Sequence, residues 1–91
     1  MIYLISYDLN KPGQNYADLY EAIKSAGVWW HYLDSTWLLD TWLTAAQVSD
    51  KLRPCIDDND NILVIGVTNE YAGWLPQKAW DWLRVRMNKA A

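Results

Sequence analysis

Apolar positions follow two different periods along the chain, and the changes between them divide it into short elements. Residues 2–8 and 62–68 are almost continuously apolar and rich in β-branched and aromatic side chains, which is typical of buried strands. Residues 28–33 and 36–41 have the same enrichment and predict two further strands. A tight turn at residues 34–35 joins them, so the middle of the chain is a predicted hairpin.

Two segments with a helical period separate these strands. In the first, Asn15 is the expected N-cap and Gly27 is the expected residue after the helix end, with the apolar side chains on one face between them. In the second, Thr44 and Gln47 have the spacing of a capping box, and Pro54 ends the helical pattern.

A third helical segment follows the last strand. It is expected to begin at Pro76, because proline is favoured in the first helical turn, and to run to about residue 88. This makes residues 74–91 a C-terminal helical extension of a single domain that spans residues 1–91. The apolar face of the extension comprises Ala79, Trp80, Leu83 and Met87.

The order β-α-β-β-α-β with an added C-terminal helix predicts an α+β protein with a ferredoxin-like sandwich. Right-handed crossovers would place the first two helices on the same face of the sheet. The first and last strands are nevertheless apolar on both faces. We therefore expect the second face to be covered as well, either by the third helix or by a second subunit.

Composition adds an aromatic bias to this picture. The 91 residues include seven tryptophans and six tyrosines but no phenylalanine, and rings with a polar tip suit half-wet surfaces. Four tryptophans fall within fourteen residues, namely Trp29, Trp30, Trp37 and Trp42. They fit internal packing, a dimer interface or a platform on which nucleotide bases stack, and the pattern leaves these alternatives open.

Charge is distributed unevenly, although the net charge is only −3. The first 77 residues hold four basic residues against ten acidic ones, whereas residues 78–91 hold four against one. An acidic body disfavours non-specific binding of a polyanion. In the basic tail, Trp82 and Arg86 lie about one helical turn apart. If exposed, the pair would make a cation–π contact or a docking spot for a partner, and if buried, it would clamp the last helix on the domain.

Several classes of protein are disfavoured by what the chain contains. A single cysteine, Cys55, excludes an internal disulfide, and no apolar run or signal-peptide pattern is present, so we expect a cytoplasmic protein without a membrane partner. His31 is the only histidine, which disfavours a zinc centre. Asp57, Asp58 and Asp60 do not fit a calcium-binding EF-hand loop and predict a solvated turn.

Four segments are specific enough to compare with a known family. They are YLISYDL at 3–9, KPGQNY at 11–16, LDSTW at 33–37 and DNILVI at 60–65. Together they resemble the SinR-like small proteins, which are similar in turn to the second CRISPR-associated protein family and to VapD-type ribonucleases. The resemblance covers about residues 1–68 and implies a ferredoxin-like homodimer packed through its sheets.

The resemblance also implies a catalytic role for Asp8. In the CRISPR-associated family, an aspartate at the end of the first strand faces its symmetry mate and holds a divalent metal between the subunits. Two such carboxylates suit Mg²⁺ or Mn²⁺, which would activate water at a scissile phosphate. Asp8 instead caps the following turn in the alternative interpretation. His31 is the candidate general base or, alternatively, a structural histidine.

Two functions lead the hypotheses. The first is a small homodimeric binding or adaptor protein that acts on a nucleotide, a nucleic acid or a nucleic-acid-handling partner, one version being a counter-defence protein of a phage or mobile element. The second is a metal-dependent endonuclease, acting on RNA or DNA, with Asp8 paired across a dimer axis. A structural subunit of a larger assembly is the third. The candidate binding residues are Tyr7, Asn10, Lys11, Trp29, Trp30, Ser35, Trp37, Trp82, Arg84 and Arg86.

Overall fold

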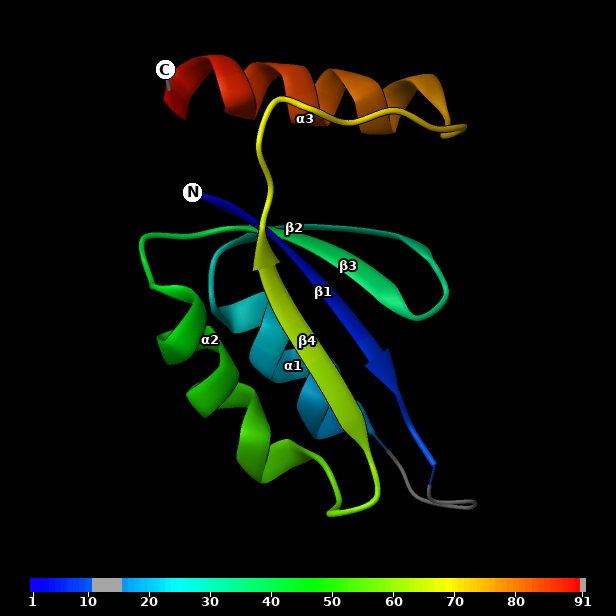
Figure 1. Cartoon of the computed structure of the whole chain (residues 1–91), viewed down its shortest axis with the longest axis vertical. Coiled ribbons are helices and arrows are strands. Elements are labelled where there is room, and N and C mark those ends of the chain that lie inside the picture. The colour runs from blue at the N-terminus through cyan, green and yellow to red at the C-terminus, as the bar shows by residue number, and fades with distance from the viewer. Residues whose placement is uncertain (11–15, 91) are drawn as a thin grey trace.

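A computed structural model describes residues 1–10 and 16–90 of the chain, without the side chains of residues 88–90. Within these residues it forms an α+β fold with a four-stranded antiparallel sheet and three α-helices (Figure 1). The elements are β1 (Ile2–Asp8), α1 (Ala17–Ser25), β2 (Val28–Leu33), β3 (Thr36–Asp40), α2 (Ala45–Leu52), the 3₁₀ turn η1 (Arg53–Cys55), β4 (Asn61–Gly66) and α3 (Gln77–Ala90).

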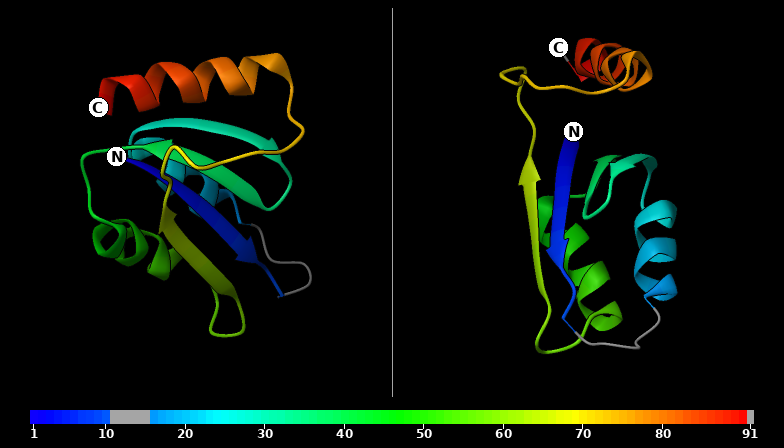
Figure 2. Two further views of the ribbon diagram at one scale, coloured as in Figure 1. Left: turned by 45° about the horizontal axis from the view of Figure 1, so that its top comes forward. Right: turned by 90° about the vertical axis from the view of Figure 1, so that its right-hand side faces the viewer.

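The strands are ordered β2-β3-β1-β4 across the sheet. The first strand is therefore central, and Ile5 lies opposite Trp37 of β3 on one side and Val64 of β4 on the other. Helices α1 and α2 pack on the same face of the sheet, as the two crossovers predict (Figure 2). This arrangement is compatible with a ferredoxin-like fold.

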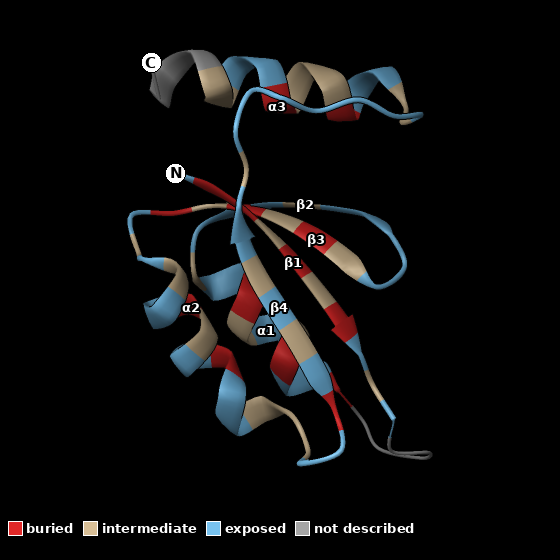
Figure 3. Ribbon diagram, viewed as in Figure 1, coloured by how far each residue is buried: buried red, intermediate tan, exposed pale blue. Residues whose placement is uncertain are grey.

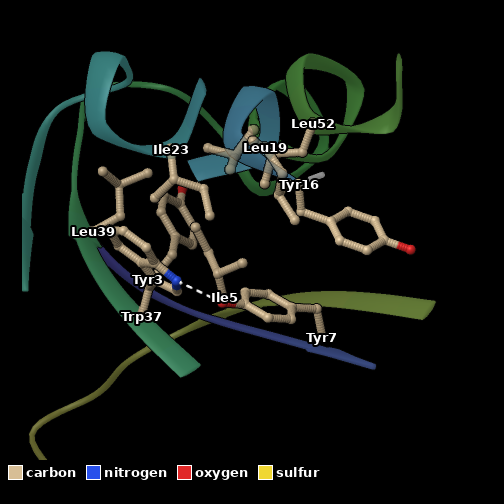
Figure 4. Close-up of a cluster of buried hydrophobic side chains, with 10 residues drawn as sticks. Tyr3, Ile5, Tyr7, Tyr16, Leu19, Ile23, Trp37, Leu39 and Leu52 are labelled. Carbon is tan, nitrogen blue, oxygen red and sulfur yellow. Dashed lines mark hydrogen bonds between the residues drawn. The ribbon is translucent and has the colours of Figure 1, made fainter. Parts of the chain in front are cut away.

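The main core lies between that face and the two helices (Figure 4). Alternate residues of β1 point into it, because successive side chains of a strand face opposite ways. The helices contribute fully buried side chains at the positions that the helical period predicts. Each buried leucine or isoleucine contributes roughly 1.5–3 kcal/mol through removal of apolar surface from water. The cluster includes Tyr3, Ile5, Tyr7, Leu19, Ile23, Trp37, Leu39, Val48 and Leu52.

The helix ends agree with the predicted caps in part: α1 has Tyr16 as its N-cap, without a side-chain cap, whereas the capping box of α2 is present. Thr44 Oγ1 accepts a hydrogen bond of 3.1 Å from the Gln47 amide, and Gln47 Oε1 accepts one of 2.9 Å from the Thr44 amide, so the capping box is confirmed. The N-cap predicted at Asn15 lies outside the described residues. Gly27 follows the end of α1 as expected, but glycine is needed there because a Cβ atom would overlap the Asp40 carbonyl oxygen.

Helix α3 covers only part of the second sheet face. Ala79 and Leu83 of this helix are buried, and Arg86 reaches Asp40 at the end of β3. The side chains of Leu63 and Ile65 on β4 remain 56% and 51% exposed, and β4 has no buried residue (Figure 3). The third helix is thus the cover over β2 and β3, whereas the same face of β4 is open. No helix in the described part of the chain is long and apolar enough to cross a membrane.

Candidate functional site

Asp8 lies at the exposed end of β1, on the sheet face opposite the main core. Asn61 is opposite it in the register with β4, and a shallow hollow of about 240 Å³ lies beside both residues. The side-chain nitrogen of Asn10, Nδ2, is 3.4 Å from the Asp8 carboxylate and 3.4 Å from the backbone carbonyl oxygen of Asp8. Such long contacts hold the carboxylate weakly, so Asp8 is accessible to a ligand or a second chain.

His31 lies on the other face of the sheet. Its ring stacks on Trp37 with the centroids 3.8 Å apart and an interplanar angle of 12°. Its Nε2 atom is 3.2 Å from the carbonyl oxygen of Asp34 in the hairpin turn. Within one chain, His31 and Asp8 are therefore too far apart to act on the same substrate atom.

Tyr7 and Trp37, both candidate binding residues, are buried in the core and bonded to each other (Figure 4). Trp37 Nε1 donates to the Tyr7 hydroxyl over 3.0 Å, and that hydroxyl donates to the Asp34 carbonyl over 3.3 Å. Burial raises the pKa of Tyr7 above its ordinary value because the phenolate would lose its hydration. Ser35 joins the same corner, where its carbonyl accepts a 3.1 Å hydrogen bond from the Tyr7 amide.

Trp29 and Trp30 face opposite sides of β2, as strand alternation requires. Trp29 is 40% exposed at the edge of the main core, 5.3 Å from the Trp37 ring, and Lys24 Nζ lies 5.2 Å above it. Trp30 faces the side covered by α3 and stacks on Tyr32, with 6.4 Å between the ring centroids. The four neighbouring aromatic residues of β2 and β3 therefore do not form one stacking platform.

The loop between η1 and β4 contains a buried carboxylate that the sequence did not reveal. Asp60 is 8% exposed and accepts hydrogen bonds from the Asn10 amide at 2.7 Å, the Asp57 amide at 2.8 Å and the Tyr16 hydroxyl at 2.9 Å. The predicted solvated turn is thus wrong for Asp60, whose carboxylate holds the loop against α1. Asp58 agrees with the prediction, being 94% exposed with an ion pair to Arg53.

Asn10 belongs to this loop arrangement through its side chain as well. Its amide nitrogen donates a 2.9 Å hydrogen bond to the carbonyl of Asn59. The backbone between the end of β1 and the loop before β4 is therefore tied at two points. Lys11, the other candidate next to it, lies outside the described residues.

A cavity of about 280 Å³ lies between α3 and the sheet face that this helix covers. Two aromatic pairs contribute to its walls, Trp30 with Tyr32 from the sheet and Tyr71 with Trp80, whose rings stack 6.0 Å apart. Within the described part of the chain, no charged residue lines it. The other side chains of the lining include Leu4, Leu33, Leu38, Val67, Trp74, Leu75 and Leu83.

Trp30 carries an unpaired donor at this cavity. Its Nε1 atom is buried and has no hydrogen-bond partner. A buried indole N–H normally finds an acceptor, and leaving a buried donor unpaired costs about 1–3 kcal/mol. The lining is otherwise mostly apolar, and its other polar side-chain groups are the hydroxyls of Tyr32, Thr36 and Tyr71.

The basic residues of α3 have different surroundings. Arg86 is 23% exposed, its Nη1 donates over 3.2 Å to the Asp40 carboxylate, and its guanidinium lies 4.8 Å above the Trp82 ring. The predicted cation–π contact between Arg86 and Trp82 is therefore formed, and the ion pair with Asp40 also links α3 to the end of β3. Arg84 instead pairs with Asp81 on the outer surface, at 2.6 Å.

Sequence reasoning identified Trp30 as a candidate but missed most of the cavity lining. The available signal was the apolar and aromatic content of residues 71–75, which form part of the connector between β4 and α3. Comparisons with protein-family models, curated proteins and solved structures found no match to this chain. The function is therefore argued from the site itself.

Proposed function

We propose that the protein is a small binding or adaptor protein with a ferredoxin-like fold, and that its ligand is a nucleotide, free or within a nucleic acid. The observation that carries this proposal is the aromatic cavity between α3 and the sheet. A nucleotide base is flat and stacks well on Trp and Tyr rings, at about 1–3 kcal/mol per base. The strand order β2-β3-β1-β4 supports the fold assignment.

The charge distribution supports a binding mode in which the base of the nucleotide is buried and its phosphate stays exposed. Only the base would enter the cavity, because burying a phosphate among uncharged residues is strongly unfavourable. The phosphate would stay in solvent near the last helix, where residues 78–91 carry four basic residues against one acidic residue. The acidic body would keep affinity for long polyanions low.

Isothermal titration with nucleoside monophosphates, cyclic dinucleotides and short single-stranded oligonucleotides tests this function. We expect saturable binding of at least one nucleotide, with weak dependence on salt because few phosphate contacts form. Trp42→Ala is the control variant, since Trp42 is fully exposed and outside the cavity. An absence of binding to every nucleotide in the series would refute the proposal.

A metal-dependent endonuclease is the second candidate, and the position of Asp8 favours it. Asp8 is exposed and shares the open sheet face with Leu63 and Ile65, the two exposed apolar residues of β4. A second copy packed on these residues around a two-fold axis would bring two Asp8 carboxylates together. Two carboxylates and bound waters suit Mg²⁺ or Mn²⁺.

Cleavage of end-labelled RNA and DNA with Mn²⁺ tests the endonuclease, with wild type and Asp8→Asn purified in parallel. The hypothesis expects cleavage by the wild type alone and a dimer by light scattering. Equal cleavage by both proteins would indicate a contaminant, and a monomer would refute the paired site. Asp58→Asn is the matched control, because it makes the same substitution at an exposed aspartate in the loop before β4, away from Asp8.

A further inference from the structure

We infer that the cavity under α3 binds a flat, uncharged ring system carrying a hydrogen-bond acceptor, and that Trp30 Nε1 donates to this acceptor. The inference deepens the proposed function, on which it rests, by assigning the class of ring and the residue that selects it. Three observations carry it: the volume and shape of the cavity, the absence of charge among its described lining residues, and the unpaired donor of Trp30.

The volume sets the size of the ligand. An apolar cavity of about 150 Å³ accommodates benzene, and ligand pockets generally begin at about 300 Å³. The cavity under α3, at about 280 Å³, therefore fits one or two fused rings. Aromatic residues enter its walls from both sides, Trp30 from the sheet and Trp80 from the helix, so a flat ring gains more contact than a branched aliphatic group.

The lining determines the charge of the ligand. The walls offer leucine side chains, aromatic rings and the neutral hydroxyls of Tyr32, Thr36 and Tyr71, and an ion buried there would lose its hydration without a counter-charge. A neutral ring does not have this penalty. Any charged substituent of the ligand must therefore remain outside the cavity.

The Trp30 indole determines which neutral ring is preferred. Its N–H is buried without an acceptor, although Trp30 itself lines the cavity. The donor has no exposed surface, so a ligand atom reaches it only when Trp30 or its neighbours shift. The ion pair between Arg86 and Asp40 is a polar contact that links α3 to the end of β3. A ring nitrogen or carbonyl oxygen would then supply the missing acceptor.

Quinoline and naphthalene test this inference directly in the wild-type chain. The two molecules have nearly the same shape and are uncharged at neutral pH, but only quinoline has an acceptor. Titrations followed by ¹H–¹⁵N correlation spectra report all seven indole N–H signals. We expect quinoline to bind about fivefold to tenfold more tightly than naphthalene, as one hydrogen bond allows. The Trp30 signal, identified by its loss in Trp30→Phe, should move downfield with quinoline alone.

Two variants separate the cavity from the donor. Trp30→Phe keeps a ring but removes the N–H, so the preference for quinoline should disappear while naphthalene still binds. Leu38→Trp fills the cavity, and both rings should then fail to bind. Trp42→Phe is the matched control, because it removes an exposed indole and should change neither affinity.

The outcomes distinguish this inference from the proposed function. Equal affinity of the wild type for both rings would overturn the role of Trp30, and an absence of binding would overturn the site. Quinoline binding as described, without binding of any nucleotide, would support the site and refute the proposed function. Nucleotide binding that is unchanged in Leu38→Trp would overturn the site and leave the proposed function standing.

Discussion

Asp60 provides a demanding test of the packing of the loop before β4. Its carboxylate receives hydrogen bonds from two backbone amides, those of Asn10 and Asp57, and from the Tyr16 hydroxyl. A hydrogen bond to a charged group contributes about 1.5–3 kcal/mol, and partial relaxation of the loop reduces the sum. We therefore expect Asp60→Ala to lower the free energy of unfolding by about 3–5 kcal/mol. Asp60→Asn, which retains one acceptor oxygen, should lower it by about half as much.

Urea denaturation followed by far-ultraviolet circular dichroism measures these changes. A domain of this size has a total stability of roughly 5–14 kcal/mol, so Asp60→Ala should move the midpoint far below that of the wild type. Asp58→Ala is the matched control, because its carboxylate is 94% exposed and its ion pair with Arg53 is worth at most about 1 kcal/mol. If Asp60→Ala costs no more than Asp58→Ala, the carboxylate does not hold the loop and the argument is refuted.

Three further variants test other parts of the fold. Gly27→Ala should destabilise the domain by about 2–4 kcal/mol, because its Cβ would overlap the Asp40 carbonyl, and an unchanged melting temperature would contradict the close approach. Arg86→Met should speed hydrogen exchange of the α3 amides without comparable change in β1, whereas Arg84→Met, which breaks a surface pair, should not. Tyr7 has a raised pKa in the folded state, so its contribution to stability is complete below its ordinary pKa of 10.0 and declines as the pH rises through the folded-state value. Melting temperatures measured between about pH 9 and 12 should therefore fall more steeply for the wild type than for Tyr7→Phe.

Local signals in the sequence were sufficient for the elements. Thr44 and Gln47 carry their own capping geometry, and Val48 and Leu52 occupy the buried positions that the helical period predicts. The hairpin was equally local, since its turn residues and flanking strands are adjacent in the chain. The apolar character of both faces of the first and last strands predicted a cover over the second face. Helix α3 supplies it beside Leu4 of β1, whereas on β4 Leu63 and Ile65 stay exposed in the single chain, and cover by a second subunit stays a prediction.

The candidate site depended on contacts that no local pattern records. Asp60 resembles its exposed neighbours in sequence and becomes buried only because Tyr16 and Asn10, more than 40 residues away, donate to it. Asp8 and His31 lie on opposite faces of the sheet because of the register between the strands, and this register cannot be read from the sequence alone. The cavity lining comes from three strands, the connector and α3, so its chemistry emerges only after the elements pack.

The division of the second sheet face separates the two proposed functions physically. Helix α3 and the cavity lie over β2, β3 and the Leu4 end of β1, where Leu4 is paired with Ile65 of β4. Asp8 and Leu63 lie towards the other end of β1 and β4 and do not line the cavity. A second copy packed against Asp8 and Leu63 would therefore not need to contact Trp30. Ring binding needs a single chain, while paired carboxylates need two. A charged residue in place of Leu63 should therefore weaken dimer formation, which the endonuclease needs, without changing ring binding, which needs one chain. The two proposed functions can thus be tested separately in the same protein.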